Sequence, residues 1–340
     1  MPYYMYVALQ EDDKILVHTI EPQTGKLTPQ AEVSIPGGPF TMAISPDRKF
    51  LYAGCRDTPQ LASFQIDQDS GGLTQNGTIP VEGWPVYIAT DRKGKFVLSA
   101  YYQGAHVGVH PIGADGSVGD PPIEWLATAT GAHAMQTDST NSYAFAPHIA
   151  GNGPNAIFQF KFDENTGHLT PNSPAKVEPE EFLGPRHFCF HPSLDVLYFS
   201  NEQDCSVTGY RLDTGNGTLS AFQTITTLPE GYTERNTCSQ IQVSASGRFL
   251  YAPNRGHDSI ACFSIDTATG QLTGNGIVAS EARPNALCLG PQDRFLYSAG
   301  QESGRMASFR VNSDSGKLTP LETYPLGNAP VWVSITELPG

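Results

Sequence analysis

The stretch Phe249-Leu250-Tyr251-Ala252 belongs to a series of short hydrophobic runs that recur along the whole chain. Close copies are Phe50-Leu51-Tyr52-Ala53, Val196-Leu197-Tyr198-Phe199 and Phe295-Leu296-Tyr297-Ser298. With three weaker copies, the series has seven anchor positions, which are Tyr6, Tyr52, Leu98, Phe145, Tyr198, Tyr251 and Tyr297. Successive anchors are 46, 46, 47, 53, 53 and 46 residues apart. A repeat of this length made of strands and turns is typical of a propeller blade. The sequence therefore predicts an all-β fold, a seven-bladed β-propeller.

Each repeat also contains a turn of the Thr-Gly-x-Leu-Thr type. Clear copies occupy residues 24–28, 70–74, 166–170, 269–273 and 315–319, and weaker ones occupy 115–118 and 216–219. Glycine supplies the positive φ that a tight hairpin needs, so we expect this turn to join the third and outermost strands. A further run, such as residues 39–44, precedes each anchor as an inner strand. Each blade should therefore have four strands.

The two ends of the chain contain complementary parts of one blade. Tyr6 begins the chain in a second-type strand without an inner strand, whereas residues 329–335 resemble an inner strand without a successor. We expect the last 12 residues or so to complete the blade that the first 35 begin. Such closure removes an exposed sheet edge and joins both ends of the ring.

Composition narrows the class of protein. The 340 residues include 34 acidic and 20 basic side chains, and a formal net charge of −14 disfavours nucleic acid and anionic membranes as partners. No leader or membrane-spanning run is evident, and six cysteines without a Cys-x-x-Cys pair fit a reducing compartment. We expect residues 1–340 to form a single domain in the cytoplasm. The oligomeric state is not predicted.

The strand register predicts which residues meet at one mouth of the central channel. A hairpin places the start of the inner strand beside the end of the second strand, at positions 12 before and 4 after each anchor. The first set is Phe40, Val86, His133, Arg186, Ser239, Asn285 and Val331, and the second is Gln10, Arg56, Tyr102, Ile149, Glu202, Arg255 and Gln301. Four consecutive blades have polar residues in the first set. One sector of the mouth should therefore differ chemically from the rest.

Neighbouring residues extend this polar sector and suggest a pocket for a small acid. We expect Arg186, Arg255, Glu202 and His133 at its centre. Further expected substrate contacts are His148, His187, Asn254, His257, Arg283, Asn285 and Tyr101. Scattered His and Glu residues show no ligand spacing, so no metal site or cofactor is predicted, and a divalent ion stays an alternative.

Structural explanations compete with each of these candidates. Arg186 and Glu202 are compatible with an ion pair that only holds one blade together. Arg255 is close enough in sequence to pair with Asp258 alone. His133 is compatible with a hydrogen-bonded packing residue.

Two segments resemble the propeller lactonase family, which includes propeller-type 6-phosphogluconolactonases and the fungal carboxy-cis,cis-muconate lactonising enzyme. One is Gly184-Pro185-Arg186-His187 with Asn201-Glu202, and the other is Asn254-Arg255-Gly256-His257. The resemblance implies that the family's site arginines, glutamate and histidine fall on Arg186, Arg255, Glu202 and His133. Relatives have Pro-His-x-His where this chain has Gly131-Ala132-His133-Ala134, which indicates a shifted substrate choice.

The resemblance implies hydrolysis of a small anionic lactone of a sugar acid. In this hypothesis the arginines bind the anionic group and the oxyanion. Glu202 acts as general base and His133 as general acid, or the two roles are reversed, because nearby guanidinium groups weaken a carboxylate base. The alternatives are a lactone-forming cycloisomerase of the carboxymuconate type and a non-catalytic binding propeller.

Overall fold

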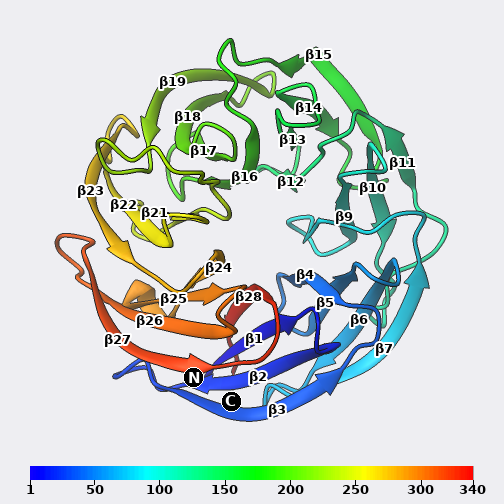
Figure 1. Ribbon diagram of the computed structural model, residues 1–340. Helices are drawn as coiled ribbons and strands as arrows, with labels where there is room; N and C mark the ends of the chain where they lie inside the picture. Colours follow the sequence, from blue (N-terminus) through cyan, green and yellow to red (C-terminus); the bar gives the residue numbers. More distant parts are fainter. Residues whose placement is uncertain (340) are drawn as a thin grey trace.

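The computed structural model describes residues 1–339 and contains seven four-stranded antiparallel sheets arranged in a ring (Figure 1). The predicted seven-bladed β-propeller is confirmed. The helical content of the described residues is one 3-10 turn, η1 (Pro291–Asp293), and no helix there is long or apolar enough to span a bilayer.

The blades are numbered from the N-terminus, and their strands are given from the inner to the outer edge. Blade 1 comprises β28 (Pro330–Glu337), β1 (Tyr3–Leu9), β2 (Lys14–Ile20) and β3 (Leu27–Ser34). Blade 2 comprises β4 (Pro39–Ile44), β5 (Phe50–Cys55), β6 (Gln60–Ile66) and β7 (Leu73–Pro80). Blade 3 comprises β8 (Tyr87–Thr90), β9 (Phe96–Tyr101), β10 (His106–Pro111) and β11 (Glu124–Ala127). Blades 4 and 5 comprise β12 (Gln136–Thr137), β13 (Tyr143–His148), β14 (Ala156–Phe162) and β15 (Leu169–Val177); and β16 (Pro185–Phe190), β17 (Val196–Asn201), β18 (Ser206–Asp213) and β19 (Thr218–Thr226). Blades 6 and 7 comprise β20 (Gln242–Val243), β21 (Phe249–Asn254), β22 (Ser259–Ile265) and β23 (Leu272–Ala279); and β24 (Pro284–Leu289), β25 (Phe295–Gly300), β26 (Arg305–Val311) and β27 (Leu318–Pro325).

Blade 1 closes the ring with strands from both ends of the chain. β28 pairs antiparallel with β1, where Tyr6 lies opposite Ser334 and Val7 opposite Val333. Both ends of the chain therefore lie at the same blade (Figure 1). This is the closure that the sequence predicts, and it leaves the inner strand of blade 1 paired like the others.

The anchor tyrosines connect neighbouring blades. Four of their hydroxyl groups donate to the backbone carbonyl of the glycine in the next blade's Thr-Gly turn, in the pairs Tyr6 to Gly71, Tyr198 to Gly270, Tyr251 to Gly316 and Tyr297 to Gly25. Gly25 has a φ of 75°, and a Cβ atom there would lie 2.3 Å from the Phe295 ring, so the turn requires glycine. The Tyr52 hydroxyl is buried and has no hydrogen-bond partner within residues 1–339.

The hydrophobic core lies between the faces of adjacent blades rather than at one centre. The cluster between blades 1 and 2, for example, joins Tyr6 and Val17 to Leu51 and Phe64. The anchor strands therefore bury side chains on both faces, which explains their continuous hydrophobic runs. A blade cannot bury these faces alone, so stability depends on the whole ring.

Most inner strands begin with a proline followed by a bulged residue. The pairing register skips Phe40, Arg186 and Asn285, each of which directly follows a proline. A bulge re-aims the side chain of its extra residue, here at the start of the inner strand. In blades 4 and 6 the inner strands are shorter still, since β12 and β20 have two residues each. The inner strands are therefore most irregular where the polar sector lies.

Candidate active site

Three aromatic side chains from blades that are not neighbours meet inside the channel. The ring centroids are 5.1 Å apart for Tyr87 and His187, 5.6 Å for Tyr87 and Trp332, and 5.9 Å for His187 and Trp332. Because the three residues come from blades 3, 5 and 1, these contacts cross the channel. We call Tyr87, His187 and Trp332 the aromatic plug.

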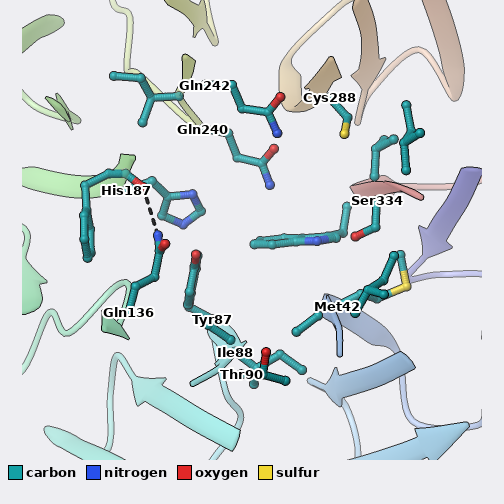
Figure 2. Close-up of a pocket in the computed structure, with 18 of the residues that line it drawn as sticks. Met42, Tyr87, Ile88, Thr90, Gln136, His187, Gln240, Gln242, Cys288 and Ser334 are labelled. Atoms are coloured by element: carbon teal, nitrogen blue, oxygen red, sulfur yellow. Dashed lines mark hydrogen bonds between the residues drawn. The ribbon is translucent and has the colours of Figure 1, made fainter. Parts of the chain in front are cut away.

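A cavity of about 350 Å³ lies along the inner strands on one side of the plug (Figure 2). Gln240 and Gln242 line it, and their Oε1 atoms accept backbone N–H groups of Leu287 and Leu289 at 3.0 and 2.8 Å. These glutamines therefore tie blade 6 to blade 7. The cavity is bounded by residues toward the far ends of the inner strands, away from the predicted mouth.

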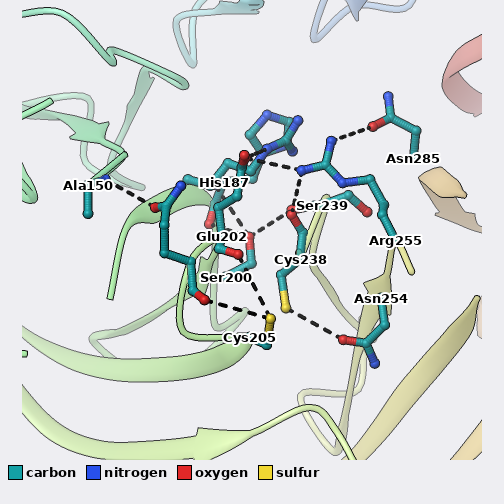
Figure 3. Close-up of polar contacts among 12 residues, drawn as sticks. Ala150, His187, Ser200, Glu202, Cys205, Cys238, Ser239, Asn254, Arg255 and Asn285 are labelled. Carbon is teal, nitrogen blue, oxygen red and sulfur yellow. Dashed lines mark hydrogen bonds and ion pairs between the residues drawn. The ribbon is translucent and has the colours of Figure 1, made fainter. Parts of the chain in front are cut away.

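A charged cluster of Arg186, Glu202 and Arg255 lies where inner strands begin and second strands end, and Figure 3 shows Glu202 and Arg255 within it. The Glu202 Oε2 atom is 2.7 Å from Arg186 Nε and 3.1 Å from Arg255 Nη2. All three side chains are largely buried, with 17%, 4% and 10% of their respective areas exposed. The cluster combines two guanidinium groups with one carboxylate, so it carries a formal charge of +1.

The backbone fixes where these side chains project. The N–H of Glu202 donates to the Gly184 carbonyl at 2.7 Å, and the N–H of Arg255 donates to the Thr237 carbonyl at 2.8 Å. These are the same hairpin contact in blades 5 and 6, and Glu202 and Arg255 both lie four residues after an anchor. Equivalent positions in neighbouring repeats therefore lie side by side in the structure.

Neighbouring groups hold Arg255 in place. Its Nη2 donates to the Cys238 carbonyl at 3.0 Å and its Nη1 to Asn285 Oδ1 at 3.2 Å. Asn285 Nδ2 in turn donates to the Val331 carbonyl at 3.2 Å. The guanidinium group is therefore fixed by blades 6 and 7 as well as by Glu202.

Several buried nitrogen and oxygen atoms of the cluster have unused hydrogen-bonding capacity. Within the described residues, Arg186 Nε and Nη1, Arg255 Nε and Glu202 Oε2 have no aligned hydrogen-bond partner. The short Arg186–Glu202 contact is thus an ion pair whose N–H group is not directed at the oxygen. Buried donors without partners are costly, and a ligand oxygen would satisfy them. Burial, together with the charge of Arg255, lowers the pKa of Arg186 to about 9, so the group stays protonated at neutral pH.

His133 lies next to the cluster and contacts the plug. Its ring centroid is 5.2 Å from that of His187 and 5.9 Å from that of Tyr102. Burial is the main cause that holds the pKa of both histidines well below 6.5, and the nearby charge of Arg186 acts in the same direction. Both imidazoles are therefore neutral at physiological pH. The Nδ1 atom of His133 and the Nε2 atom of His187 have no partner in the described part of the chain.

Three expected contact residues face the packing between blades instead of the mouth. Tyr101, His148 and Asn254 lie three residues after an anchor, and all are 0% exposed. His148 uses both ring nitrogens, on the Ala146 carbonyl and Thr128 Oγ1, each at 2.9 Å. Strand side chains alternate between faces, so position three points away from the side that position four occupies. These three residues are not available to a ligand at the mouth.

Asn254 and two rim residues have clear structural contacts. Asn254 Oδ1 accepts from Thr227 Oγ1 at 2.7 Å, which braces the strand end that carries Arg255. His257 contacts Ser259 Oγ at 2.7 Å. Arg283 forms an exposed ion pair with Glu302 at 3.2 Å. His257 and Arg283 thus lie outside the buried cluster.

The purely structural roles considered for Arg186 and Arg255 account for only part of their contacts. Arg186 and Glu202 do form an ion pair, but it spans more than one blade because Arg255 shares the same oxygen. The Asp258 carboxylate accepts the backbone N–H of Arg283, and Arg255 pairs with Glu202. Within residues 1–339 no group of three or more His, Cys, Asp or Glu side chains is positioned to hold a metal ion.

Sequence reasoning missed the plug as a unit. Tyr87, His187 and Trp332 occupy equivalent repeat positions, 11 residues before the anchor or at its equivalent in the closing strand. A census of that position would have shown three aromatic rings in alternate blades. The signal was therefore present one residue beyond the positions that the hairpin argument selects.

Comparisons with known proteins agree with this architecture. A family model described as lactonase, 7-bladed beta-propeller, matches residues 4–335. A protein named 6-phosphogluconolactonase from Pectobacterium carotovorum subsp. carotovorum is 35% identical over 338 residues, covering 99% of this chain and 100% of the relative. One of the same name from Pectobacterium atrosepticum is 34% identical with the same coverage. The solved structure of the periplasmic gluconolactonase of Pseudomonas aeruginosa has a TM-score of 0.91 at 23% identity, with both chains covered completely, which shows the shared fold.

Proposed function

This chain belongs to the seven-bladed β-propeller lactonase family, and on that premise we propose that it hydrolyses the lactone of a phosphorylated sugar acid. The names of the curated relatives support this substrate class. The reaction adds water across the ester bond of the ring and yields the open-chain acid. The site for it is the Arg186–Glu202–Arg255 cluster with His133.

The observation that carries the proposal is the placement of two buried guanidinium groups around a single carboxylate. An attacking water converts the planar lactone carbonyl to a tetrahedral oxyanion, and prearranged donors in a dry site stabilise that charge. Arg186 and Arg255 have N–H groups without aligned partners, and both pair with Glu202. Asn285 and the Cys238 carbonyl also hold Arg255. Such donors require little rearrangement during the reaction.

The low pKa of His133 favours one assignment of acid and base. A neutral imidazole can accept the proton of the attacking water, whereas a resting imidazolium would be needed for His133 to act first as an acid. His133 then returns that proton to the ring oxygen as the C–O bond breaks, so no net proton is stored. Glu202, held between two guanidinium groups, orients them and balances part of their charge. In this assignment His133 is first base and then acid, and Glu202, expected from the sequence as one member of an acid-base pair, acts as a positioning residue.

A substrate panel tests the proposed function. Purified protein is assayed by pH-stat titration with glucono-δ-lactone, its 6-phosphate and a muconolactone, each with and without chelator. We expect acid release above the spontaneous rate for the sugar-acid lactones, strongest for the 6-phosphate, and no effect of the chelator. Acid release confined to the muconolactone, or none with any substrate, would reject the proposal.

A further inference from the structure

Arg56 lies in blade 2 at the place that Glu202 and Arg255 occupy in blades 5 and 6. Its backbone N–H donates to the Gly38 carbonyl at 2.8 Å, the same hairpin contact. Blade 2 lies across the ring from blades 5 and 6 (Figure 1). Arg56 therefore projects at the same mouth as the charged cluster, from the opposite side.

Aromatic rings form a platform under the Arg56 guanidinium. Its Cζ atom is 4.7 Å from the centroid of Trp84 and 5.7 Å from that of Phe40. The two rings contact each other edge to face at 5.2 Å. A guanidinium that stacks through its face keeps its planar edge of N–H donors free.

Most other stacked arginines in this chain use those donors internally. Arg92, Arg211, Arg248 and Arg294 lie over aromatic rings and donate to backbone carbonyls of a neighbouring blade. Within the described residues, the side chains of Arg56 and Arg310 make no such bonds. Arg310 stacks on Phe295 from the outer part of blade 7, so Arg56 is the one of this pair at the mouth.

The charge of Arg56 is also uncompensated. Arg186 and Arg255 share Glu202, and Arg283 pairs with Glu302. Arg56 forms no ion pair with a carboxylate among residues 1–339, and its side chain is exposed. An immobilised, exposed guanidinium with free donors suits a phosphate, which accepts two parallel N–H bonds.

We propose that Arg56 binds the phosphate of the substrate while the lactone carbonyl lies on Arg186 and Arg255; this inference rests on the proposed function. In a 6-phosphorylated gluconolactone, the reacting carbonyl is C1 and the phosphate is attached outside the ring through C6. The two ends of one molecule thus need two separate cationic groups. The plug fills the channel one residue further in, so a ligand seated on it lies between both sides of the mouth.

The test compares kcat/KM for 6-phosphoglucono-δ-lactone with kcat/KM for glucono-δ-lactone. Arg56→Gln should lower the ratio of the two values by about 10- to 100-fold, the loss expected for one charged hydrogen-bonding group. Arg56→Lys should lose part of the ratio, because an ammonium keeps the charge without the planar donor edge. Trp84→Leu should lower the ratio as well, since it removes the platform.

Two controls separate this inference from simpler explanations. Arg310→Gln removes a stacked arginine away from the mouth, and Arg235→Gln removes an exposed arginine next to the Arg255 loop that has no aromatic platform. Both should keep the wild-type ratio. An unchanged ratio in Arg56→Gln, or an equal fall in either control, would overturn the inference while leaving lactone hydrolysis intact. A wild-type protein without lactonase activity would overturn both.

Discussion

At the position four residues after the anchor, blades 5 and 6 carry Glu202 and Arg255, whereas blades 1 and 7 carry Gln10 and Gln301. All four backbone N–H groups make the same hairpin hydrogen bond to the strand beside them. These four positions therefore have the same backbone contact and carry different side chains. The repeat supplies equivalent places, and a few different side chains at those places form the charged cluster that we propose as the site.

Blade 2 differs from these four blades in how its anchor tyrosine is bonded. Tyr198 and Tyr251 in blades 5 and 6 donate to the next blade at 2.6 and 2.8 Å, and Tyr6 and Tyr297 in blades 1 and 7 do so at 2.9 and 2.7 Å. Tyr52, in the strand that ends near Arg56, has no partner among the described residues.

The largest expected effect comes from Glu202→Gln. The neutral amide cannot orient both guanidinium groups, and small misplacements at a reacting centre cost about 100-fold, so kcat/KM should fall by about 10²–10³. Unfolding in urea should show a loss of about 3 kcal/mol, because two buried positive charges lose their carboxylate.

Gln301→Ala is the matched control at the equivalent place in blade 7. It removes a polar side chain without a buried charge, so both activity and stability should stay near wild type. Turnover of a folded Glu202→Gln protein within a few-fold of wild type would show that the polar sector is not the reactive one.

The hairpin register within blade 5 made Arg186 and Glu202 predictable as neighbours, and the equivalent position in blade 6 places Arg255 at the same mouth. Tyr101, His148 and Asn254 were also expected to face the mouth, and this expectation is not met. Those residues lie one position earlier, on the face that packs against the next blade. The rings of the aromatic plug occupy equivalent positions in three repeats, but their contacts cross the channel between blades that are not neighbours, so strand pairing within a blade does not predict that they meet.

The pH dependence of kcat/KM tests the contribution of the polar sector. His133 lies there at the position that Val86 has in the apolar sector, and only the histidine can titrate. A base must be neutral, and burial and Arg186 hold the pKa of His133 well below 6.5. Activity should therefore persist as pH falls from 7 through 6.5 and decline only at more acidic values. The pKa of about 9 for Arg186 predicts a second decline as pH rises through 9, because the oxyanion loses a charged donor. An activity that falls as pH rises above 6.5 would instead identify His133 as the resting acid.

The smallest expected effect separates Tyr198→Phe from Tyr52→Phe. Both remove one buried hydroxyl from the anchor strand, but the Tyr198 hydroxyl donates to the Gly270 carbonyl and the Tyr52 hydroxyl has no partner in residues 1–339. Loss of the Tyr198 bond leaves a carbonyl unsatisfied and should cost about 1 kcal/mol, whereas loss of the unpaired Tyr52 hydroxyl should be neutral or stabilising. Melting temperatures at one fixed scan rate would measure the difference. Equal shifts in the two variants would mean that the hydrogen bond from Tyr198 to Gly270 contributes no more to stability than the unpaired Tyr52 hydroxyl does, and that blades 2 and 5 differ mainly in side-chain chemistry at the mouth.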